Sequence, residues 1–200
     1  MSITPDNKNW TWVLERPCPD CAFDAETIAN RDIGMIIRDV ASQWEVVLFH
    51  PQVRQRPLPN VWSPLEYGCH VRDVFRLFDK RLVMMLTLDT PTFANWDQDK
   101  TAVDDRYDLQ DPVVVRREIV FAGDQVADRF DSVADAEWGR KGLRSDGGVR
   151  VRATPTPPER STTPRPAATT PAREATRTAL QAHADHEARA RRPCSRLCSR

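Results

Sequence analysis

The aromatic residues of this 200-residue chain stop abruptly, and this limits where a folded core can form. All six tryptophans and all seven phenylalanines precede residue 148, and residues 149–200 contain no aromatic residue. Apart from alanines and two cysteines, that last segment offers only four apolar side chains: Val149, Val151, Leu180 and Leu197. So little apolar surface cannot offset the entropy lost on ordering. We therefore place the domain at residues 27–148 and predict that residues 149–200 form a disordered Arg/Pro/Ala/Thr-rich tail.

The charge is divided at the same point. The tail holds eleven arginines and four acidic residues, so it carries a net charge of about +7, and residues 1–148 carry about −7 because the whole chain sums to zero. A basic tail can attract nucleic acid by releasing counterions. This tail has no aromatic side chains for base stacking and its arginines are dispersed. Weak, salt-sensitive, nonspecific binding is the most that we predict.

The location is expected to be cytoplasmic. No apolar run follows a basic start, which argues against a signal peptide, and no stretch reaches the eighteen or so apolar residues of a membrane span. Five cysteines are an odd number and too sparse for a secreted disulfide scaffold. We therefore expect no membrane partner and reduced thiols.

Three segments have the periodicity of amphipathic helices, and they follow a polar lead-in at residues 1–26. The first runs from an N-cap at Asn30 to about His50, where Pro51 disfavours further helix. The second begins at Ser63-Pro64-Leu65-Glu66, a capping box with proline at the first helical position, and extends to about Leu88. The third opens at Asp111-Pro112 and carries an apolar stripe to Val133.

The remaining segments of residues 27–148 show no regular pattern. Residues 89–111 are polar and acidic and are expected to form a loop. Trp138 and Leu143 are the last apolar side chains that we expect to contact the core. No stretch alternates as a strand would. The prediction is an all-α helical bundle.

The segment around the second predicted helix resembles the DinB-like superfamily. The residues that carry the resemblance are Trp62-Ser63-Pro64-Leu65-Glu66 followed by His70-Val71-Arg72-Asp73, which match Trp-Ser-x-x-Glu-x-x-x-His-(Val/Leu)-x-Asp. Asn95-Trp96-Asp97-Gln98-Asp99 and Arg16-Pro17-Cys18-Pro19-Asp20-Cys21 are similar to segments of one branch of that superfamily. The resemblance covers about residues 8–147. It implies an up-down bundle of the DinB-like four-helix type.

The same resemblance implies a chemistry. Related proteins bind a divalent metal such as zinc, nickel or manganese through three histidines, one on helix two and a His-x-x-x-His pair on helix four. Some are thiol (S-)transferases or isomerases that use a low-molecular-weight thiol. His70 corresponds to the helix-two ligand. It is the metal-ligand candidate of this chain, and we name no catalytic residue.

This chain departs from the pattern where the fourth helix would begin. After Arg144-Ser145-Asp146-Gly147 it turns into the low-complexity tail, so the fourth helix is expected to be missing or replaced. One hypothesis is a frameshift; the alternative is a natural extension. Without two of three ligands we expect an inactive or impaired enzyme. The alternatives are a non-catalytic interaction module and weak nucleic-acid binding through the tail.

Other candidate groups are interpreted as structural. His183 and His186 could share a helical face and replace missing ligands, but a solvated polar stretch is the simpler interpretation. The Cys18/Cys21 pair lacks a convincing second pair for zinc, because Cys194/Cys198 has different spacing and lies in the tail. Cys69 is expected in the core, His50 at the surface, and the acidic residues Asp97, Asp99, Asp104 and Asp105 in a solvated loop.

A bundle that lacks one helix should expose apolar surface. Large exposed apolar patches favour association. We therefore expect self-association or marginal stability.

Overall fold

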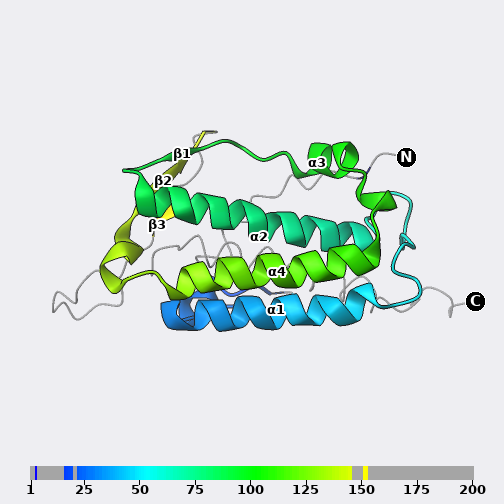
Figure 1. Ribbon diagram of the computed structural model, residues 1–200, viewed down its shortest axis with the longest axis horizontal. Coiled ribbons are helices and arrows are strands. Elements are labelled where there is room, and N and C mark those ends of the chain that lie inside the picture. The colour runs from blue at the N-terminus through cyan, green and yellow to red at the C-terminus, as the bar shows by residue number, and fades with distance from the viewer. Residues whose placement is uncertain (1–2, 4–15, 20–21, 146–150, 153–200) are drawn as a thin grey trace, which may run out of the picture.

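A computed structural model describes residues 3, 16–19, 22–145 and 151–152 of the chain. Three long helices form its body: α1 (Ile33–Leu48), α2 (Pro64–Thr87) and α4 (Pro112–Asp131). Helix α4 lies between the other two and packs along both, whereas α1 and α2 touch each other little (Figure 1). The all-α bundle predicted from the sequence is confirmed.

The order of directions departs from a simple up-down bundle. Helix α1 is antiparallel to α4, since Arg38 pairs with Asp131 near the opposite ends of the two helices. Helices α2 and α4 run in the same direction, as Figure 1 shows by their colours, because residues 88–111 return along the length of α2 before α4 begins. Helix α1 is therefore antiparallel to both α2 and α4, as in an up-down bundle, whereas α2 and α4 are parallel.

The start of α2 follows the local rules that the sequence predicted. The Ser63 hydroxyl accepts a hydrogen bond from the backbone N–H of Glu66, and the Glu66 carboxylate accepts one from the N–H of Ser63. Two of the amides that a helix N-terminus leaves unpaired are satisfied in this way. The start of α4 is also confirmed, with the Asp111 carboxylate accepting from the N–H of Val113.

The start of α1 differs from the prediction. Asn30 does not cap it; residues Asn30–Asp32 form a 3₁₀ turn, η3, and α1 begins at Ile33. Asp32 already has helical backbone angles, so the 3₁₀ turn runs directly into the helix without a side-chain cap.

The core lies where the three long helices face one another. Helix α1 contributes Ile33, Ile37, Val40, Ala41, Trp44 and Leu48, and α4 contributes Val115, Ile119, Ala122, Val126, Ala127 and Phe130. Gly123 permits the close approach of the helices, since a Cβ atom there would lie 2.7 Å from the Cβ of Ala41. None of the described helices has the length and apolarity needed to cross a bilayer.

Residues 88–111, which we name the crossover, contain more regular structure than the loop predicted at residues 89–111. The crossover includes the two-residue strand β1 (Thr92–Phe93), the short helix α3 (Gln98–Asp104) and the 3₁₀ turn η4 (Tyr107–Leu109). Two residues are too few to show strand alternation, and α3 buries no residue, so neither leaves a periodic apolar pattern in the sequence. The loop assignment was therefore wrong for these elements.

A small sheet was also missed. Strand β1 pairs in parallel with β2 (Lys141–Arg144), and β2 pairs antiparallel with β3 (Val151–Arg152). Leu143 lies in β2 and is 37% exposed, so it is not a core foothold, whereas Trp138, in the 3₁₀ turn η5 (Asp135–Gly139), is buried against Phe130 as expected.

Strand β3 bears on the prediction that the chain is disordered from residue 149. Residues 151–152 pair with Gly142 and Lys141 of β2, and the domain boundary at residue 148 stays a prediction. The rest of the tail, with the fate of the fourth helix, lies outside the described residues.

Candidate functional site

His70 lies in the second turn of α2, on the side covered by the crossover. The residue is only 5% exposed. The Trp96 ring, from the crossover, stacks on it with centroids 5.3 Å apart and planes 4° apart. Trp62, just before α2, contacts it with a centroid distance of 5.3 Å and a tilt of 47°. Two tryptophans therefore enclose the imidazole.

This enclosure determines the charge of His70. Burial lowers its pKa to about 4, although the nearby Asp73 carboxylate acts in the opposite direction. The imidazole is therefore neutral near pH 7, which is the form that binds metal ions. Its Nδ1 atom is buried and has no hydrogen-bond partner among the residues that the structure describes. Such an orphaned polar atom costs stability unless a ligand or water satisfies it.

Two carboxylates share the helix face of His70, because Glu66, His70 and Asp73 are spaced by four and three residues. Both carboxylates are already engaged. Arg56 holds Glu66, with its Nε donating to Oε2 at 2.8 Å. Arg72 donates to both oxygens of Asp73, at 2.9 and 3.1 Å.

Asp73 is the centre of a buried polar network that joins three elements. The Tyr107 hydroxyl of η4 donates to Asp73 Oδ2 at 2.5 Å. Arg72, itself 5% exposed, also donates through Nη1 to Gln110 Oε1 and, on α4, to Glu118 Oε2. Burial would raise the pKa of Asp73, but the hydrogen bonds from Arg72 and Tyr107 outweigh it and hold that pKa below its ordinary value. Asp73 is therefore an ionised anchor for the crossover.

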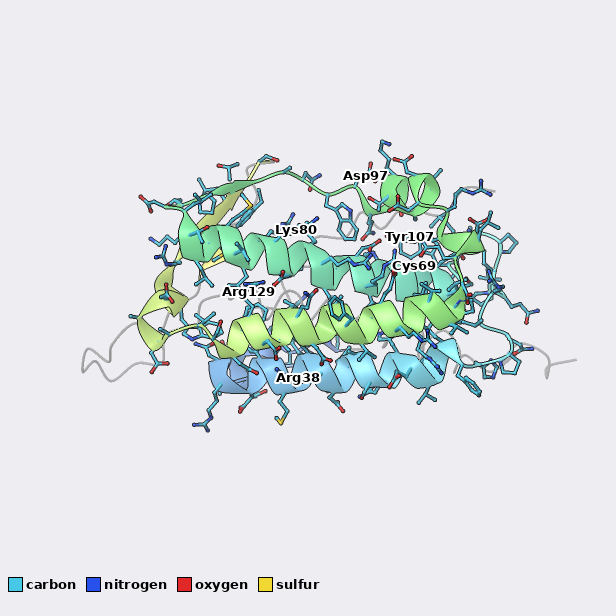
Figure 2. All side chains as sticks on the ribbon, viewed as in Figure 1. Arg38, Cys69, Lys80, Asp97, Tyr107 and Arg129 are labelled. Carbon is cyan, nitrogen blue, oxygen red and sulfur yellow. The ribbon has the colours of Figure 1, made fainter. Side chains whose placement is uncertain are left out.

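Cys69 is part of the core, as expected. Its side chain is fully buried, and its Sγ lies 3.5 Å from Gln110 Oε1. Figure 2 shows Cys69 and Tyr107 close together where α2 begins and the crossover ends. Burial raises the pKa of the Cys69 thiol to about 12, so the thiol stays protonated near pH 7 and is not a nucleophile there.

The other candidates do not converge on His70. His50 is exposed at the end of α1, where its Nδ1 accepts from the N–H of Gln52 at 3.2 Å, which confirms a surface role. Cys18 is buried and unpaired. Four of the candidates, Cys194, Cys198, His183 and His186, fall outside the described residues, as does Cys21.

The acidic crossover is not a cation site either. Asp97 caps α3 by accepting from the N–H of Lys100, and Asp104 pairs with the Lys100 ammonium group. No group of three or more His, Cys, Asp or Glu side chains in the described part of the chain could hold a metal ion.

His70 was predicted from its motif, but most of its surroundings were not. No motif included Tyr107, Gln110 or Glu118. The one signal in the sequence was a single tyrosine among acidic residues, and it was not used. Trp62 and Trp96 were in the quoted segments, but their contact with His70 requires the path of the crossover.

Sequence comparison finds neither a family model nor a curated protein that matches this chain. Structural comparison does find a match, to YfiT from Bacillus subtilis, described as a probable metal-dependent hydrolase with an unusual four-helix bundle topology. The TM-score is 0.63 at 13% identity, over 82% of this chain and 86% of YfiT. The chain has the DinB-like fold.

This likeness establishes the fold alone, because the identity is low. The three-histidine centre of the DinB-like family is not assembled by the described residues. His70 fits as one neutral donor, but the carboxylates on its face are held by arginines and the adjacent thiol is protonated. One donor is too few for a zinc-like site.

Proposed function

We propose that this DinB-like bundle derives from a divalent-metal-dependent enzyme, that His70 is its retained metal donor, and that its catalysis is impaired or lost. The observation that carries the proposal is the state of His70: buried, neutral near pH 7, with an Nδ1 atom that no described residue satisfies. A histidine kept only for packing gains nothing from this arrangement, because a buried polar atom without a partner is unfavourable.

The histidines of the sequence support impaired catalysis. The chain contains four histidines: His50, His70, His183 and His186. No His-x-x-x-His pair exists, since His183 and His186 are three residues apart rather than four. A centre of the family's form therefore cannot be built from this sequence without a different ligand spacing.

The reaction class is part of the proposal. The resemblance implies thiol transfer with a low-molecular-weight thiol, whereas YfiT is described as a probable hydrolase. Both alternatives depend on a divalent metal, with zinc, nickel or manganese as the candidates, and both assign a ligand role to His70. A metal measurement therefore tests them together.

The test is metal binding by the full chain, purified without a histidine tag. We expect less than one equivalent of zinc, nickel or manganese by elemental mass spectrometry of the purified protein. Added metal should bind weakly, and His70→Ala should remove this binding. His50→Ala is the matched control and should bind like the wild type. Tight stoichiometric metal lost in both His70→Ala and His183→Ala/His186→Ala would reveal a complete site and refute the impaired-enzyme proposal. Binding unaffected by His70→Ala would refute His70 as a donor.

A second candidate is a non-catalytic interaction module. Helix α1 exposes Met35, Val46 and Phe49 on the side away from the core, and they are 64%, 77% and 78% exposed. Their spacing of eleven and three residues places them on one face of the helix. This outer stripe of exposed apolar side chains favours self-association.

A further inference from the structure

The crossover contacts the His70 ring through the side chain of Trp96. Residues 95–105, which we name the strap, run beside α2 and include α3 (Figure 1). The Trp96 ring of the strap stacks on the His70 ring over nearly parallel planes. The indole N–H of Trp96 donates to the Thr101 hydroxyl at 2.9 Å, within the strap itself. Trp96 would therefore move with the strap and keep its own hydrogen bond.

The strap is fastened at its two ends. At one end Arg81 donates to the carbonyl of Ala94, and the N–H of Asn95 donates to the Ser145 hydroxyl. Beyond the other end, Tyr107 is fully buried and bonded to Asp73. Between these anchors α3 contains no buried residue, and Trp96 and Ala102 are only partly buried against the core. Segments with so few buried contacts open at low free-energy cost while the rest of the protein stays folded.

The residue that follows the strap, Arg106, has a strained backbone. Arg106 has φ 49° and ψ 54°, in the left-handed region that residues other than glycine rarely adopt. Its neighbour Asp105 has an ordinary φ of −89°. Strain of this kind persists only while the surrounding structure enforces it. Opening the strap would let Arg106 relax, so the strain favours the open form.

We propose that the strap is a lid over His70 that opens about Arg106, and that its opening limits access of dissolved ligands to the His70 imidazole. The stack of Trp96 on His70 stabilises the closed form, and the relief of backbone strain at Arg106 favours the open form. The proposal does not require that His70 bind a metal.

Carbethoxylation by diethyl pyrocarbonate at pH 7.5 tests this, because a neutral imidazole nitrogen attacks the reagent only when it is accessible. Mass spectrometry of peptides gives separate rates for His70 and for exposed His50, which serves as the internal reference. We expect His70 to react far more slowly than His50 in the wild type. Trp96→Ala should raise the His70 rate at least about tenfold, because it removes the stack that holds the lid closed.

The hinge variant makes the opposite prediction. Arg106→Gly relieves the strain of the closed form, so the His70 rate should fall about fivefold. Asp105→Gly is the matched control: it adds the same flexibility at a residue with negative φ, so the rate should stay equal or rise. A wild-type His70 rate equal to that of His50 would overturn the lid. So would an Arg106→Gly rate that matches Asp105→Gly, or His70 rates that follow only global unfolding in urea.

Discussion

The hydrogen bond from Tyr107 to Asp73 ties the crossover to α2, and Tyr107→Phe measures its strength. The substitution keeps the buried ring and removes only the hydroxyl, which lies 2.5 Å from Asp73 Oδ2. A hydrogen bond to a charged group contributes about 1.5–3 kcal/mol. The lower end applies, because Arg72 Nη2 still donates to the same oxygen at 3.1 Å. We expect a loss of about 1.5 kcal/mol in the free energy of unfolding and a fall of about 4–8 °C in Tm.

The assay is urea unfolding at pH 7 followed by tryptophan fluorescence, within a double-mutant cycle that adds Asp73→Asn. The cycle should give a coupling of about 1 kcal/mol or more between Tyr107 and Asp73. The pH dependence has a definite sign. Because the pKa of Asp73 is lowered in the folded protein, its contribution is complete above the unfolded pKa and is lost as pH falls through the folded pKa. Coupling below about 0.3 kcal/mol at pH 7 would refute the anchor role.

Three further variants test other parts of the structure. Gly123→Ala should cost about 1–3 kcal/mol in chemical denaturation, because the added Cβ would meet the Cβ of Ala41 at 2.7 Å. His70→Phe should flatten the pH dependence of stability: the pKa of His70 is lowered to about 4, so wild-type stability falls as pH drops from about 6.5 toward 4, by up to about 3 kcal/mol. A variant that keeps this slope would contradict the assignment. Val46→Asp should reduce self-association in sedimentation velocity without lowering Tm, because Val46 is 77% exposed; unchanged association would exclude the outer stripe around Phe49.

The elements that the sequence predicted are those with dense local signals. The capping box at Ser63 and Glu66 fixes the start of α2 because both groups act within one turn, and the stripe of α4 buries Val115 through Phe130 as its periodicity indicates. His70 was found because its motif lies within this well-defined helix.

The rest depended on contacts between distant residues. Tyr107 meets Asp73 across 34 positions, and Trp96 meets His70 across 26, so no local window of sequence reports either pair. Strand β1 is defined by its pairing with residues about fifty positions later, and its two residues cannot show alternation. Trp96 is one of the two tryptophans that enclose His70, and for that reason the environment of the site could not be read from its motif.

The central position of α4 has a consequence for how the chain reaches its native state. Helices α1 and α2 are synthesised before α4. They have little contact with each other, and each packs mainly on α4. Arg38 must find Asp131 across 93 positions before the two sides are joined. Closure of such long loops slows folding relative to bundles in which successive helices pair. Refolding should therefore be slower than for an up-down bundle of equal length, and α1 should gain protection from hydrogen exchange only when α4 does.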